Sequence, residues 1–197
     1  MCLSRHLRAR SNLANLNPMS SADISVIIPT YQHADTIGRC LDSVLAQTLQ
    51  PREIIVVDDG STDETQRVIE PFARRGKWLK IHVQENQGSN PARNTGFGLS
   101  SGSRVIFLDA DVVMRPDMLE KLSRALYERP EAGFAYSAFR FGWKRFRSFP
   151  FDAARLRHMN YIHTSALICR EAFPGFDETI KRFQDWDIWL TMLEGGR

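Results

Sequence analysis

Apolar runs and amphipathic stretches alternate along the first two thirds of the chain. Short runs rich in Ile and Val have the length of buried β-strands, and they fall at residues 24–28, 53–57, 80–84 and 104–108. Between them, apolar residues at helical spacing predict amphipathic helices at about residues 35–47, 61–71, 90–99 and 116–126. Strands that are apolar on both faces and alternate with helices predict a mostly parallel, Rossmann-like sheet flanked by helices in a single α/β domain.

Local signals set the expected ends of these elements. Pro29 is expected to stop the first strand, because proline lacks the N–H that a central strand needs. Ser61 and Glu64 fit a capping box at the start of a helix that Pro71 would kink or stop.

The pattern changes after Pro130. Residues 134–141 alternate weakly, residues 162–168 predict one more strand, and residues 186–193 carry the apolar stripe of a final helix. We therefore expect the domain to have two halves, at residues 23–130 and 131–197.

Composition places the chain among globular proteins. It has 197 residues, of which 43% are hydrophobic and 25% charged, so a wholly disordered chain is excluded. Three cysteines exclude a disulfide scaffold. No apolar run approaches the roughly 20 residues of a transmembrane helix.

The net charge of +3 belongs to one end of the chain. Residues 1–22 hold Arg5, Arg8 and Arg10 without any acid, which accounts for the whole excess. We expect a disordered basic tail here; an organellar transit peptide, or an upstream extension with Met19 as the true start, remain alternatives. At the other end the chain stops at Arg197, directly after the pair Gly195-Gly196, and we expect the natural protein to continue beyond it.

Polar residues lie at the carboxyl ends of the predicted strands. In open α/β sheets, ligands bind at these ends. Four strand ends carry such polar residues, at positions 29–32, 58–61, 85–88 and 109–111. Asp109 and Asp111 alternate across one end, and carboxylates that act together with a phosphate substrate suit Mg²⁺ or Mn²⁺. The alternative is that single aspartates cap helices or turns, which fits Asp35 and Asp63 well.

Other ligand-binding patterns fail. Gly96 and Gly98 begin a dinucleotide fingerprint, but Ser101 holds its third glycine position, and a Walker loop is absent. The histidines after residue 30 lack metal-ligand spacing.

Read in order, the motifs resemble those of family 2 glycosyltransferases, which have the GT-A nucleotide-sugar fold. The matching segments are residues 25–32 (SVIIPTYQ), 56–63 (VVDDGSTD), 86–96 (NQGSNPARNTG), 107–111 (FLDAD), 174–178 (PGFDE) and 185–187 (DWD). The ordered set covers about Ser25 to Gly195 and is far more specific than any one motif.

This resemblance implies a metal-dependent inverting transfer of sugar from a nucleoside-diphosphate sugar, most often a UDP-sugar, to a hydroxyl acceptor. Residues 23–130 would be the nucleotide-sugar-binding half and 131–197 an incomplete acceptor-side half. Nucleotide-binding residues would be Pro29, Thr30, Tyr31, Asp58, Asp59, Arg93 and Asp109, while Asp111 would bind Mg²⁺ or Mn²⁺. No nucleic-acid partner is expected.

The family pattern also implies a catalytic base at Asp185, which would take the proton of the acceptor hydroxyl. The usual Glu-Asp pair reads Gln184-Asp185 here, so the acidic neighbour that could tune the base is missing. An alternative is that Asp185 only caps the last helix, and Asp187 is the second candidate for the base.

A basic, aromatic stretch lies within the second half. Its cations are Arg140, Lys144, Arg145, Arg147, Arg155 and Arg157, with Asp152 its only acid. It would meet a lipid-linked acceptor or an anionic membrane, or else be a solvated face. Its aromatic residues, Trp143 among them, would line a saccharide-acceptor site or pack as core.

We therefore expect a glycosyltransferase of polysaccharide, lipopolysaccharide or glycolipid synthesis, in the cytoplasm or at the cytoplasmic face of a membrane with which it associates peripherally. Two rivals stay open: a sugar-1-phosphate nucleotidyltransferase and a non-catalytic nucleotide-sugar-binding module. The first would need a Gly- and Arg-rich loop after the first strand, where this chain has Pro-Thr-Tyr-Gln.

Overall fold

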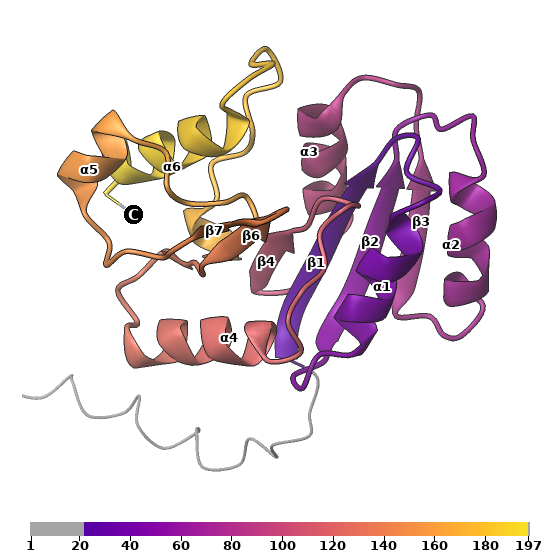
Figure 1. Ribbon diagram of the computed structural model, residues 1–197, viewed down its shortest axis with the longest axis horizontal. Coiled ribbons are helices and arrows are strands. Elements are labelled where there is room, and N and C mark those ends of the chain that lie inside the picture. The colour runs from indigo at the N-terminus through magenta and orange to yellow at the C-terminus, as the bar shows by residue number, and fades with distance from the viewer. Residues whose placement is uncertain (1–21, 197) are drawn as a thin grey trace, which may run out of the picture.

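A computed structural model describes residues 22–196 (Figure 1). The predicted tail at residues 1–22 therefore lies, except for Ala22, outside the described residues, as does Arg197.

A six-stranded sheet forms the centre of the molecule. Its order is β3-β2-β1-β4-β8-β5. The first four strands are mutually parallel, whereas β8 runs antiparallel to both of its neighbours. The strands are β1 (Ala22–Thr30), β2 (Pro51–Asp58), β3 (Leu79–Val83), β4 (Arg104–Phe107), β5 (Phe134–Ala135) and β8 (Leu167–Cys169). The expected Rossmann-like, mostly parallel sheet is confirmed, and because both halves of the chain contribute to it they form one domain.

Helices cover both faces of this sheet. Along β1 the side chains of Ile24, Val26 and Ile28 enter one core, together with α1 (Ile37–Leu45), α2 (Thr65–Ala73) and α4 (Met118–Glu128). The alternate side chain, Ile27, enters the opposite core, together with α5 (Ala153–His158) and α6 (Gln184–Glu194). On that second face α3 (Ser89–Leu99) packs against β1 and β2. In Figure 1, α1 crosses in front of β2, and α3 stands to the left of β1.

Pro29 does not end the first strand, so that prediction was wrong. The strand continues to Thr30, with Pro29 opposite Val57 of β2. In a parallel ladder successive residues bond to alternate sides. The carbonyl of Ile27 bonds Leu108 beyond β4, so the missing N–H of Pro29 faces the side on which β4 has already ended. Proline therefore costs this central strand no ladder hydrogen bond.

Several element boundaries differ from the prediction. The aromatic stretch splits into β5 and a separate hairpin of β6 (Phe139–Phe141) and β7 (Lys144–Phe146), and the strand expected at 162–168 begins only at Leu167. The capping box at Ser61 and Glu64 does not form, because Glu64 is the N-cap residue and makes no side-chain cap bond. Helix α2 includes Pro71 and ends at Ala73. A short 3₁₀ helix (Arg170–Ala172) follows β8.

Within residues 22–196 no helix is both long enough and apolar enough to span a bilayer.

Gly96 lets α3 approach the sheet closely. A Cβ atom at this position would lie 2.4 Å from Cγ2 of Ile27, whereas a Cβ at Gly98 of the same helix would meet nothing within 4 Å. Because overpacking a core costs about 1–3 kcal/mol, we expect Gly96→Ala to lower the free energy of unfolding by about 2 kcal/mol, measured by urea unfolding.

Gly98→Ala is the matched control for this substitution. It improves helix propensity by about 1 kcal/mol without a clash, so its unfolding midpoint should stay or rise. Equal midpoints for the two variants would contradict the close approach at Gly96.

Candidate active site

The site begins where β1 and β2 end side by side. Thr30 lies opposite Asp58 in the register, and the N–H of Asp59 donates to the carbonyl of Thr30 at 2.9 Å. Pro29 and Thr30 are buried in the strand, whereas the ring of Tyr31 is 46% exposed just beyond it. The predicted nucleotide residues of the first two strands are therefore neighbours, and Tyr31 offers the accessible aromatic surface among them.

The adjacent aspartates have different surroundings. Asp59 accepts hydrogen bonds from the side chain of Gln84 and from the backbone N–H groups of Gln87 and Gly88, at 2.7 to 3.0 Å. These bonds hold the loop between β3 and α3. Asp58 is fully buried; one oxygen accepts from the N–H of Ser61, and the other has no hydrogen-bond partner among the described residues.

Gln32 joins the loops that follow β1 and β2, a role that the sequence did not indicate. Its N–H donates to the hydroxyl of Ser61, and its side-chain oxygen accepts from the N–H groups of Thr62 and Asp63. Its φ of 58° lies in the left-handed region that non-glycine residues seldom adopt. These bonds join the loop that carries Tyr31 to the loop that follows Asp58.

Arg93 of α3 connects the two halves of the domain. One terminal nitrogen donates to Asp109 at 2.7 Å, after β4, and the other donates to Asn90 at 3.0 Å and to the side-chain oxygen of Gln184 at 3.1 Å, at the start of α6. The side chain is 7% exposed, and its guanidinium carbon lies 5.2 Å from the ring centre of Phe176. The structure thus places Arg93 and Asp109 in direct contact and sets the first residue of α6 against them.

Two asparagines on the same face of α3 hold the segment that leads to α6. Asn90 donates to the carbonyl of Asp177 at 2.7 Å, and Asn94 exchanges hydrogen bonds with the backbone of Phe176. Sequence reasoning missed both residues. They flank Arg93 in the sequence, but their partners lie more than 80 positions away in the chain, so no local pattern marks them.

The two aspartates after β4 differ in what they contact. Asp109 is paired with Arg93, while Asp111 is exposed. Beneath them, burial first and then the charges of Asp109 and Asp111 raise the pKa of Cys40 to about 12. Cys40 therefore stays a neutral thiol that donates to the carbonyl of Asp109. Within residues 22–196, no group of three or more His, Cys, Asp or Glu side chains forms a metal cage.

Asp185 lies in the first turn of α6 and is not its N-cap, so the capping alternative was wrong. The N-cap residue is Phe183, and Asp185 accepts from the N–H of Trp186 at 3.0 Å. Asp187, the second candidate for the base, lines a shallow pocket of about 210 Å³ together with Arg182, Phe183 and Trp186. Burial, and then the nearby Asp177, raise the pKa of Asp187 above its usual value.

We expect Arg93→Met to lower the free energy of unfolding by about 3 kcal/mol, because it leaves Asp109 and the buried amide groups without their donor. Hydrogen exchange should also become faster in residues 174–184, which Arg93 and Asn90 hold in place. Arg67→Met removes an exposed ion pair on α2 and should change stability by less than about 1 kcal/mol. Equal effects of both substitutions would contradict the connecting role of Arg93.

Comparison with known proteins extends this picture. The family model "Glycosyl transferase family 2" matches residues 25–185. The uncharacterized glycosyltransferase alr2836 of Nostoc sp. is 44% identical over 100 residues, which cover 50% of this chain and 31% of that protein. Mannosyltransferase PcManGT from Pyrobaculum calidifontis, solved with GDP-Man and Mn²⁺, superposes with a TM-score of 0.70 at 25% identity, covering 89% of this chain and 53% of that one.

TarS of S. aureus, solved with UDP-GlcNAc, superposes with a TM-score of 0.67 at 22% identity, over 83% of this chain and 51% of that one. The chain therefore spans about a third of the curated relative and about half of each solved chain. Since the family model covers most of the chain and these neighbours share its fold, the chain belongs to glycosyl transferase family 2.

Proposed function

We propose that this chain carries the donor-binding and catalytic part of a metal-dependent, inverting glycosyltransferase. It would move a sugar from a nucleoside-diphosphate sugar to a hydroxyl group of a saccharide or lipid-linked acceptor, in polysaccharide, lipopolysaccharide or glycolipid synthesis. The observation that carries the proposal is the Arg93 junction, which sets the start of α6 against the polar end of β4. The residues that would bind the sugar donor and a carboxylate for acid–base chemistry then lie together at the carboxyl ends of the parallel strands.

The nucleotide would bind at the ends of β1 and β2. The exposed ring of Tyr31 can stack on the base, because aromatic rings stack on any base. The polar loop after Asp58 offers hydrogen bonds close by, whereas Thr30 is buried at the end of β1. Asp59 acts indirectly, since its carboxylate holds the β3–α3 loop against the site. A UDP-sugar or GDP-sugar donor is supported by the nucleotide sugars bound in the two solved neighbours.

The residues present fit a divalent cation. Mg²⁺ is usually held by one or two carboxylates together with substrate phosphates, and Mn²⁺ suits the same carboxylate and oxygen ligands. Asp111 is an exposed carboxylate next to the Arg93–Asp109 pair, so the chain supplies one free anionic ligand and leaves the others to the donor. When bound, the cation would neutralise charge on the diphosphate leaving group. The ion pair with Arg93 keeps Asp109 in a fixed orientation next to Asp111.

Asp185 is the proposed general base. In an inverting transfer the acceptor oxygen forms a bond to the anomeric carbon as the bond from that carbon to the phosphate oxygen breaks, and the hydroxyl proton passes to a carboxylate. The oxygen of Gln184, next to Asp185 in the chain, accepts hydrogen bonds from Arg93 and Ser89. These two bonds fix the first turn of α6, and with it the position of Asp185.

We expect Asp111→Asn to abolish Mn²⁺-dependent binding of UDP-GlcNAc or GDP-mannose, because the amide has no charge with which to hold the cation. Calorimetric titration of nucleotide sugar with and without Mn²⁺ measures this. Asp42→Asn, which removes an exposed carboxylate from α1, is the control and should bind as the parent does. Unchanged metal dependence in Asp111→Asn would show that the cation binds elsewhere.

For Asp185→Asn we expect donor binding to persist while turnover falls about 10²- to 10⁴-fold, the usual contribution of a general base. A panel of nucleotide sugars with Mn²⁺, assayed for donor hydrolysis and for transfer to added saccharides, measures turnover. Asp187→Asn is the paired variant, and a larger loss there would assign the base to Asp187. Turnover by neither the parent nor the variants, with donor binding intact, would support a binding-only module.

A further inference from the structure

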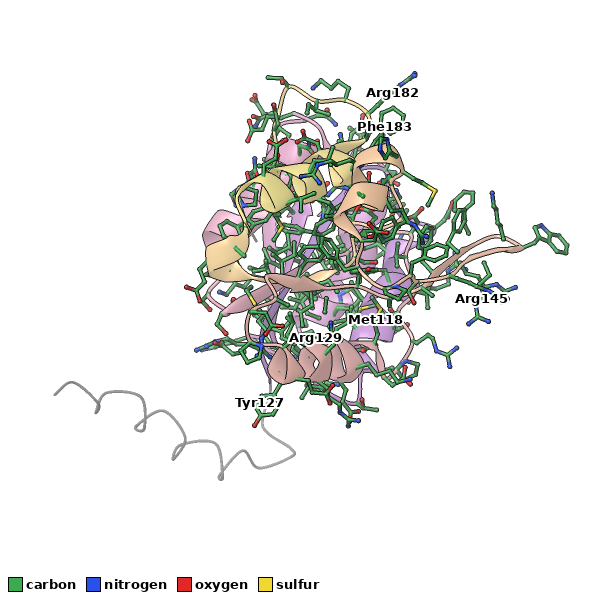
Figure 2. The ribbon with its side chains drawn as sticks, turned by 90° about the vertical axis from the view of Figure 1, so that its left-hand side faces the viewer. Met118, Tyr127, Arg129, Arg145, Arg182 and Phe183 are labelled. Carbon is green, nitrogen blue, oxygen red and sulfur yellow. The ribbon has the colours of Figure 1, made fainter. Side chains whose placement is uncertain are left out.

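The β6–β7 hairpin carries a strongly exposed aromatic tip. Phe141 is 77% exposed and Trp143 is 99% exposed, on either side of Gly142, whose φ of 55° makes the tight turn. Figure 2 shows the hairpin extending from the body of the molecule, with the labelled Arg145 beside it. Two large aromatic side chains at the tip of a projecting hairpin contribute little to the folded core, so their exposure calls for a partner.

The base of the same hairpin is firmly packed. Phe139 and Phe146 stack across the two strands with ring centres 4.5 Å apart, and Phe139 also contacts the ring of His163 at 4.8 Å. The hairpin is therefore held against the domain at one end and presents its aromatic tip at the other.

Charge on the hairpin is of one sign. Residues 132–151 contain four cations, namely Arg140, Lys144, Arg145 and Arg147, and no Asp or Glu. Arg140 and Arg145 lie directly opposite each other in the register. Like charges in opposed cross-strand positions destabilise a sheet. The pairing therefore costs the isolated protein stability, and an anionic surface would offset that cost.

The hairpin also lies near the carboxyl ends of the parallel strands, where the site is. Strand β8 runs antiparallel to β4, with Leu167 opposite Ile106, so the segment that enters β8 lies at the carboxyl end of β4. His163 belongs to that segment and contacts Phe139 at the hairpin base. The hairpin thus projects from the same edge as Asp109 and Asp111.

We propose that the β6–β7 hairpin docks this domain on an anionic lipid bilayer. Trp143 and Phe141 enter the interfacial layer, where aromatic side chains partition favourably. The four cations contact anionic headgroups, each contributing about a fivefold gain in affinity. A second copy of this chain fits the hairpin poorly, because four positive charges would face four positive charges. The proposal does not depend on the reaction catalysed.

The test uses the full chain and vesicles of phosphatidylcholine and phosphatidylglycerol in equal parts, compared with phosphatidylcholine alone. We expect binding to the anionic vesicles only, weakened by salt because exposed charges are screened. Trp143 is one of four tryptophans, and Trp189 is buried. The emission of Trp143 should shift to the blue on binding and be quenched by brominated lipid chains. A Trp143→Phe variant should keep the binding and lose most of the quenching.

Two further variants separate the contributions. Phe141→Ser/Trp143→Ser should abolish vesicle binding, and Arg140→Gln/Arg145→Gln should weaken it about 25-fold while raising thermal stability slightly, because the opposed charges are gone. Tyr127→Ser in the last turn of α4 and Arg129→Gln at its C-cap, both labelled in Figure 2, are the matched controls for an exposed aromatic and an exposed cation. Both should bind vesicles as the parent does.

The basic residues at positions 5, 8 and 10 are shared by all variants, so differences among them report the hairpin alone. Vesicle binding that survives the aromatic double substitution, or quenching that is the same in Trp143→Phe, would overturn the proposal. A change from dimer to monomer in the aromatic variant, without vesicle binding by the parent, would instead assign the hairpin to self-association.

Discussion

The site depends on one buried guanidinium. Arg93 extends from α3 between the end of β4 and the start of α6, and it bonds an acid on one side and an amide on the other. Arginine suits this place because its planar head offers five donors in fixed directions and stays charged. A buried charge without a counter-charge would be very costly, so the orientation of Asp109 and the placement of α6 follow from the need to satisfy the two terminal nitrogens of Arg93.

The residue Gln184 changes the charge balance of this junction. The related family pattern has an acid at this position, whereas here the guanidinium meets one carboxylate, Asp109, and neutral oxygens. Arg93 and Asp109 therefore neutralise each other within the protein, and Asp111 is left as the exposed carboxylate of the pair that follows β4. A site with one free acid is suited to share a cation with a diphosphate more than to hold it alone.

The parallel core of this fold could be predicted from the sequence, because its strands are short, apolar and separated by amphipathic helices. The polar strand ends could be predicted for the same reason, since topology brings them to one edge. Which polar side chains hold which loops could not be predicted. Gln32, Asn90 and Asn94 each bond partners at least 29 positions away in the chain, and nothing local marks such partners. The continuation of β1 through Pro29 depends likewise on where β4 ends.

The order of strands in the sheet has a consequence for how the chain folds. The parallel strands β1 to β4 are neighbours and are complete by Phe107, whereas β5 reaches the sheet only through β8, which lies 32 positions later. During synthesis the first four strands can associate while β5 still has no edge to join. Closing the loop from β5 to β8 carries an entropic cost before any contact compensates for it. The Arg93 junction is therefore completed late, once α6 has emerged and its first turn reaches a sheet that is already formed.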